Sequence, residues 1–149
     1  MTMQWGALRR RAAGDRGSLT LEMVVLAPGL LLLLSFAIFV GRVTTAGQAV
    51  EQAAAAAART ASIARTAGTA QSTATEAART TLAQQNIVCV NTTVTVDTSG
   101  FTRAVGTTAT VTTTVTCVLD LSSLGPGIPG TRTLSGTSVS PLDTYRSRA

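Results

Sequence analysis

The chain lacks the side chains on which most enzyme chemistry depends. Its 149 residues contain no histidine and no lysine, and its seven carboxylates are scattered rather than paired. It also has no glycine-rich phosphate-binding loop. General acid–base and nucleophilic catalysis need a positioned base or nucleophile, so the composition argues against an enzyme. We expect no catalytic residues, no cofactor and no small-molecule substrate.

Metal and nucleic-acid binding have little support either. A structural zinc ion needs four ligands, and two cysteines without histidine cannot supply them. The net charge of +5 would suit nucleic acid, but aromatic residues make up only 3% of the chain, and stacking on bases needs them. Four of the twelve Lys and Arg residues, all of them arginine, lie in residues 1–17. The excess of basic over acidic residues therefore reflects the orientation of the chain in a membrane rather than nucleic-acid binding.

The longest feature that is present is an apolar, uncharged run from Met23 to Val40. As an α-helix this run would be about 27 Å long, against about 30 Å for the hydrocarbon core of a bilayer. Extending it back to Leu19 completes a full span. We therefore predict a single-pass membrane protein whose transmembrane segment covers residues 18–41.

Charges on either side of this segment predict its orientation. Residues 1–17 carry four arginines against one aspartate, whereas only Arg42 follows the span before Arg59. The positive-inside rule then puts the N-terminus in the cytoplasm and everything after Gly41 outside the cell membrane.

Glu22 lies within this apolar helix, where an ionised carboxylate is costly. At the centre of a span it costs about 2.5 to 3.5 kcal/mol on insertion scales, and less near an end. Either Glu22 sits at the depth of the lipid headgroups and reaches water, or its partner is a positive group on another protein.

Two ordinary membrane signals compete with a more specific interpretation. A secretory signal peptide shares the basic start, but its apolar core has only about 7 to 15 residues before a small-residue cleavage site. Here the core is longer, and no convincing site of that kind follows Val40 directly, although Thr45-Ala46-Gly47 or Ala53 to Ala58 could be stretched into one. An uncleaved signal anchor would fit the length and would leave Gly17 and Glu22 without a role.

The residues around the start of the helix resemble a processing signal. Gly17, the small Ser18, Glu22 as the fifth residue after the glycine, and a hydrophobic helix make up the signature of type IV prepilins. Pro28, Gly41-Arg42 and the alanine-rich continuation are similar, more narrowly, to the TadE-like pseudopilins of tight-adherence (Flp-type) pilus systems. The resemblance covers residues 14 to about 67.

This resemblance implies a function and a set of partners. A prepilin peptidase would cut between Gly17 and Ser18 and remove residues 1–17 as a basic leader. The new Ser18 amine, with an unperturbed pKa of about 7.7 to 8.0, would be largely protonated. Glu22 would then either dock against that amine of a neighbouring subunit or serve only as a recognition element or be tolerated during translocation. The protein would be a minor pilin or pseudopilin in pilus assembly. It would be located in the membrane or the pilus, with other subunits and the assembly platform as partners.

Pro28 lies in the middle of the predicted span. Proline removes one hydrogen bond of the helix and favours a kink, which membrane helices tolerate. The kink is either a flexible point that helps the subunit leave the bilayer or an ordinary feature of a membrane helix.

Residues 42–85 are rich in alanine and predict helices outside the membrane. Alanines at three- and four-residue spacing predict that the first helix extends from Leu19 to about Thr66, with a face suited to close packing on other subunits or on the protein's own C-terminal domain. Gly68 and the polar residues 69–75 predict a break. Thr73 and Glu76 have the form of a capping box and predict a second helix from Thr73 to about Gln85, the alternative being one longer kinked helix.

Residues 86–140 are rich in threonine and valine, which predicts a small antiparallel sheet. Residues 94–96 and 111–117 alternate as half-buried strands do. Two strands alone are marginal in water, so they must pack on the second helix, on a further strand at about 132–140, or on a partner subunit. The prolines and glycines of residues 125–130 predict a loop, and residues 141–149 an exposed tail. The expected fold class is α+β: a long N-terminal helix, a second short helix and about three strands.

The two cysteines, Cys89 and Cys117, both lie in this outer region. Beyond the membrane an even pair of cysteines favours a disulfide, which would stabilise the domain by about 3 to 4 kcal/mol in the chain-entropy model.

Overall fold

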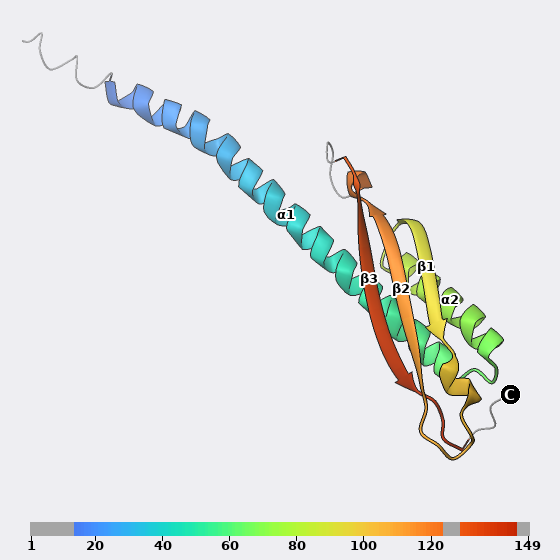
Figure 1. The fold of residues 1–149 in the computed structure, drawn as a ribbon. Coiled ribbons are helices and arrows are strands. Elements are labelled where there is room, and N and C mark those ends of the chain that lie inside the picture. The colour runs from blue at the N-terminus through green and yellow to red at the C-terminus, as the bar shows by residue number, and fades with distance from the viewer. Residues whose placement is uncertain (1–13, 124–128, 146–149) are drawn as a thin grey trace, which may run out of the picture. The chain divides into compact units, whose positions relative to one another are not determined.

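The computed structural model describes residues 14–123 and 129–145, and the side chains of residues 22–122 and 129–145. The chain divides into two compact units, residues 1–40 and 41–149. The described part is α+β, with a long apolar N-terminal helix, a second helix and a three-stranded antiparallel sheet (Figure 1), as the sequence predicts. The main elements are α1 (Gly14–Ser62), α2 (Ala67–Gln84), β1 (Cys89–Asp97), β2 (Thr110–Asp120) and β3 (Thr131–Pro141).

Helix α1 supplies the whole described part of the first unit and continues into the second without interruption. It begins at Gly14, five residues before the predicted Leu19, and ends at Ser62 rather than near Thr66. Among the described residues it is the one helix that is long and apolar enough to cross a membrane, with a mean hydropathy of 2.7 over its most apolar window.

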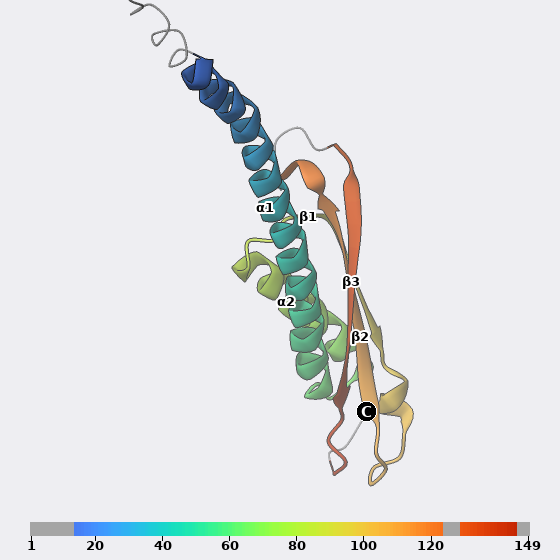
Figure 2. The same cartoon turned by 90° about the vertical axis from the view of Figure 1, so that its left-hand side faces the viewer.

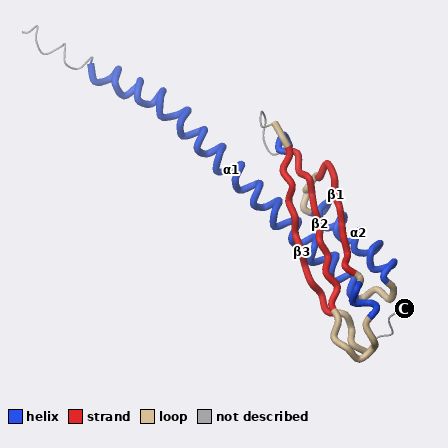
Figure 3. The backbone as a smooth tube through the Cα atoms, viewed as in Figure 1, coloured by secondary structure: helices blue, strands red, loops and turns tan. Residues whose placement is uncertain are grey.

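In the second unit, α2 and the part of α1 after Gly41 cover one face of the sheet, and the other face is open to solvent (Figure 2). The strands form a meander in the order β1-β2-β3, and each neighbouring pair is antiparallel (Figure 3). The side chains of β2 alternate strictly between the two faces because successive residues of a strand point to opposite sides. Those on the helix side are fully or almost fully buried: Val111, Thr113, Val115, Cys117 and Leu119.

The predicted start of the second helix was wrong. Helix α2 begins at Ala67, and its N-cap is Thr66, whose hydroxyl oxygen accepts a hydrogen bond from the backbone N–H of Thr69 at 3.1 Å. Thr73 lies inside the helix and donates its hydroxyl proton to the carbonyl oxygen of Thr69, so Thr73 does not form a capping box. Gly68 is tolerated in the first turn because burial of alanines and one leucine on the core side outweighs its low helix propensity. The buried residues are Ala70, Ala74, Ala78 and Leu82.

The predicted tail at residues 141–149 is not exposed throughout. Pro141 ends β3, and Leu142 is buried, with its backbone N–H donating to the carbonyl oxygen of Ala109 at 2.8 Å. Leu142 is the apolar residue through which this polar segment packs on the core. Residues 146–149, and residues 124–128 of the predicted loop, lie outside the described part, as do residues 1–13 of the predicted leader.

Candidate functional site

Glu22 is the single charged side chain at the start of a long apolar surface on α1. All described side chains from Glu22 to Ile38 are exposed within this chain, including large ones such as Leu32, which is 72% exposed. No ion pair or hydrogen bond joins Glu22 to another residue of the described part. Within the described residues the carboxylate is therefore open to a partner.

Gly17 and Ser18, the predicted cleavage position, lie in the first turns of α1. Their side chains fall outside the described part, so only their backbone conformation is known. A peptidase cleaves an extended backbone, so cleavage between these residues would require the first turn of α1 to unwind locally. Helix ends leave backbone groups unpaired, which makes this end of α1 the least costly part of the helix to unwind.

Pro28 is accommodated within α1, which continues as a regular helix on both sides of it. Its missing N–H leaves the carbonyl oxygen of Val24 without the usual partner four residues on. The neighbouring Gly29 has open space around it, since a Cβ built there would meet no atom within 4 Å. Flexibility at Pro28 stays a prediction.

The alanine face of α1 packs on the protein's own C-terminal domain, which was one of the two predicted partners. The alanines and one valine of this face are at most 1% exposed and form the core together with α2 and the sheet. They are Ala46, Ala49, Val50, Ala53, Ala54, Ala57, Ala58 and Ala61. Small side chains allow close approach of the helix to the sheet, so this face is not free to bind other subunits.

A glycine in β3 makes the closest part of this contact. A Cβ on Gly136 would lie 2.8 Å from the Cα of Glu51 and 2.9 Å from the carbonyl oxygen of Val50. These are backbone atoms that cannot move aside easily, so the sheet contacts α1 through the bare backbone at Gly136.

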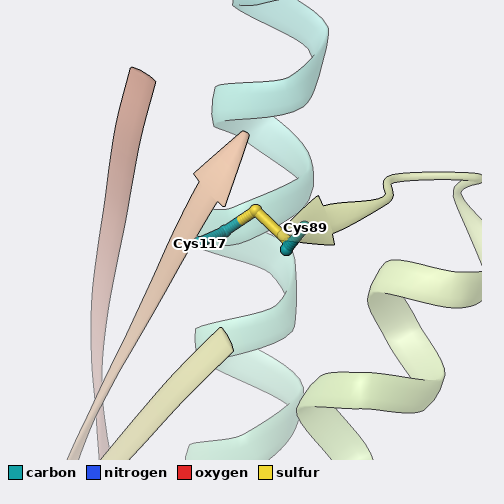
Figure 4. Close-up of a disulfide and its surroundings, with 2 residues drawn as sticks. All are labelled: Cys89 and Cys117. Atoms are coloured by element: carbon teal, nitrogen blue, oxygen red, sulfur yellow. A yellow bond between two sulfur atoms is a disulfide. The ribbon is translucent and has the colours of Figure 1, made fainter. Parts of the chain in front are cut away.

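Cys89 and Cys117 form a disulfide, as the sequence predicts (Figure 4). The bond joins the first residue of β1 to the eighth of the eleven residues of β2, with a Cα–Cα distance of 5.5 Å and a separation of 28 residues. Cys117 is fully buried against the helices, whereas Cys89 is half-buried. A shift in the strand register between Cys89 and Asn91 accompanies the bond. The disulfide therefore closes the end of the sheet where β1 begins.

A small polar cavity of about 210 Å³ lies at the opposite end of the sheet, where the chain passes from β1 to β2. Asp97 and Arg103 line it together with hydroxyl groups of Ser99 and Thr108. Hydrogen bonds from the backbone N–H and the side chain of Ser99 hold the pKa of Asp97 below its usual value. The cavity can take a polar group.

The sequence analysis did not single out this cavity. The signal for part of it is a short pattern, an aspartate followed two residues later by serine, which is typical of a turn closed by the aspartate side chain. The same pattern recurs after β2, where Ser122 lowers the pKa of Asp120 in the same way.

Comparison with protein families matches the N-terminal part of the chain. Residues 17–59 match the sequence profile of the TadE family, described as TadE-like protein. Residues 17–59 are a TadE-like domain.

The TadE-like domain begins at Gly17 and includes Glu22 and Pro28. It also includes most of the buried alanine face, but it ends before α2 and the sheet, so it does not cover the disulfide. Searches of curated proteins and of solved structures found no match to the chain.

The match covers 43 of the 149 residues of the chain. The long apolar helix of the domain fits membrane anchoring. Within the described residues, no group of three or more His, Cys, Asp or Glu side chains could hold a metal ion.

Proposed function

We propose that this protein is a TadE-like minor pilin or pseudopilin that takes part in assembly of a tight-adherence pilus. One observation carries the proposal. The TadE-like match starts at Gly17, and the described side chains of α1 form an exposed apolar surface that begins with the single carboxylate of Glu22. An ordinary membrane anchor gains nothing from that carboxylate, whereas a subunit that docks on neighbours can use it.

In this proposal the N-terminus faces the cytoplasm and the second unit lies outside the cell membrane. The arginines of residues 1–17 support this orientation through the positive-inside rule. The disulfide supports it independently, because disulfides persist in oxidising compartments and are rare in the cytosol.

Processing would occur between Gly17 and Ser18 at the cytoplasmic face. A prepilin peptidase would remove the leader with its four arginines and leave the Ser18 amine as the new N-terminus. That amine of one subunit and Glu22 of the next would neutralise each other, so that neither charge stays unpaired in an apolar environment.

Partners follow from the same picture. The membrane holds the precursor, the prepilin peptidase matures it, and other pilin or pseudopilin subunits and the assembly platform receive it. The buried alanine face is not available to these subunits, so contacts with them are left to the apolar part of α1 and to the outer surface of the second unit.

The N-terminal residue of the mature protein tests the proposal. Protein purified from the native membrane should begin at Ser18. A start at Met1 would identify an uncleaved anchored interaction protein, and a start near residue 47 a secreted protein released by signal peptidase; either would overturn the proposal.

A variant pair tests the cleavage position. Gly17→Glu should stop processing, because a large charged side chain would occupy the position next to the scissile bond. Gly14→Glu changes the leader charge by the same amount three residues earlier and should be processed normally. Normal maturation of the Gly17 variant, or equal failure of both variants, would contradict the assignment.

A further inference from the structure

The two edges of the sheet differ in how they are covered. The edge formed by β1 lies against α2, and the side-chain amide of Gln71 donates a hydrogen bond to the carbonyl oxygen of Val94 at 3.0 Å. The other edge is formed by β3, which is hydrogen-bonded to β2 on one side only. No described strand pairs with the outer side of β3.

An open edge strand invites pairing with another chain, and proteins usually protect such strands. The common protections are short length, a bulge, a proline, or charged side chains, especially lysine. β3 has 11 residues and pairs with β2 in one unbroken register from Thr131 to Pro141. Its one charged residue is Arg132, next to its start, and its one proline is the last residue. Its central part therefore has none of these protections.

The exposed face beside this edge is uncharged. Ser135 and Thr137 are exposed on β3, and they lie next to Thr116 and Thr114 of β2, with the hydroxyls of Thr114 and Thr137 3.0 Å apart. Each of these cross-strand pairs continues as a row of hydroxyl side chains into β1, where Thr93 lies next to Thr116 and Thr95 next to Thr114. A strand added to β3 would thus meet hydroxyl and methyl groups and no charge.

β3 is also held in place. Gly136, at its centre, lies directly on the backbone of α1 at Glu51, so the strand cannot move towards the helix. A binding strand that is already ordered loses little conformational entropy when a partner pairs with it.

We propose that β3 binds an extended, uncharged segment of another polypeptide as a fourth strand of the sheet. Recognition would come from main-chain hydrogen bonds along β3, and the neutral hydroxyl rows would favour Ser, Thr and small apolar side chains in the segment. This inference goes beyond the proposed function and does not depend on it, since it rests only on the second unit.

A defined peptide tests the proposal on the full chain in detergent micelles. The probe is the capped peptide of residues 131–141, which has the required neutral centre and one arginine for solubility. At millimolar concentration it should slow hydrogen–deuterium exchange of alternate β3 amides at least about tenfold and leave β1 amides unchanged. A control peptide carries proline at the positions of Leu134, Ser135, Thr137 and Ser138. It lacks donors on both edges and should have no effect.

Matched variants locate the binding edge. Ser135→Lys with Thr137→Lys should abolish the protection, because two charges would flank the added strand. Thr93→Lys with Thr95→Lys places the same charges on the same two rows at the covered edge and should leave the protection intact. Absence of protection in the wild-type chain, equal protection by the proline peptide, or protection of β1 would overturn the proposal. Protection of β3 that needs no peptide and grows with protein concentration would identify a second copy as the occupant and overturn it as well.

Discussion

Gly136 in β3 and Glu51 in α1 touch through their backbones, with room for a hydrogen atom but not for a methyl group between them. This contact sets the spacing between the sheet and the helix. Gly136→Ala should therefore force the two elements apart and destabilise the second unit by about 1 to 3 kcal/mol. Thermal unfolding followed by circular dichroism should show a melting temperature about 4 to 12 °C lower.

Gly47→Ala is the matched control, because a Cβ at Gly47 would meet no atom within 4 Å. In the middle of α1 this change should stabilise the helix by about 0.5 to 1 kcal/mol. If both variants had the same effect, the close contact at Gly136 would not be the cause.

Removing the disulfide should cost a large part of the stability of the second unit. Replacing Cys89 and Cys117 together by alanine should lower the free energy of unfolding by about 3 to 4 kcal/mol, because the bond closes a loop of 28 residues. Denaturant unfolding measures the loss. A reductant should lower the stability of the wild type to nearly that of the variant and leave the variant unchanged; a wild type insensitive to reductant would speak against a structural role for the bond.

Thr113 carries a buried hydroxyl group that has no hydrogen-bond partner in the described part of the chain. Leaving such a group unpaired costs about 1 to 3 kcal/mol, so Thr113→Val should raise the stability by a similar amount with almost no change in volume. Thr114→Val is the control on the opposite face. It removes the hydrogen bond to Thr137 and should be neutral or lose up to about 1.5 kcal/mol. Destabilisation by Thr113→Val would mean that its hydroxyl does have a partner.

The start of α2 offers a test of two threonines. Thr66→Ala removes the N-cap and should cost about 0.5 to 2 kcal/mol. Thr73→Ala, inside the helix, should be neutral or stabilising by a few tenths of a kcal/mol because alanine has the higher helix propensity. Chemical denaturation of the two variants measures their losses of stability. A greater loss for Thr73→Ala than for Thr66→Ala would support a capping box at Thr73 and Glu76 instead.

Glu22 is the residue whose role depends most on other chains. Glu22→Ala should leave cleavage at Gly17 intact but reduce incorporation into the pilus assembly at least roughly tenfold, because an unpaired amine in an apolar environment costs more than the ~1.4 kcal/mol that a factor of ten represents. Glu51→Ala, an exposed glutamate of the same helix outside the apolar run, should change neither. Quantitative blotting of sheared filaments and membranes measures both effects. Normal incorporation of the Glu22 variant would refute the docking role.

The sequence predicted those parts of the fold whose pattern is local. Alternation of apolar and polar residues located β2 and the end of β1 to within a few residues, but β1 begins at Cys89, well before Val94. The third strand was expected only as a support for these two strands, and it is present as β3. The start of α2 could not be predicted in the same way, because Gly68 and the Thr73–Glu76 pair are local signals that burial of the alanine row overrides. Leu142 was missed for a similar reason, since one leucine in a polar segment reveals its burial only through the fold.

For the candidate site, the sequence indicated the residues but not all of their surroundings. The cysteine pair and the apolar run were predicted and are present. The alanine face had two candidate partners because a stripe of small residues fits any close neighbour, and only the fold selects the sheet. Gly17, Ser18 and Glu22 act, in our proposal, through a peptidase and a second subunit, so neither the sequence nor the structure of one chain contains their partners.

Helix α1 obeys two different rules of mutational tolerance along one unbroken backbone. From Met23 to Ile38 every side chain is exposed within the chain, so apolar residues there should be interchangeable as long as the run stays uncharged. From Ala46 to Ala61 the buried positions have no room for growth, and only alanine, glycine or serine should survive at most of them. A saturation scan along α1 should therefore show a sharp change in the tolerated substitutions a few residues after Gly41. Before this point the scan should select for hydrophobic side chains, and after it for small ones.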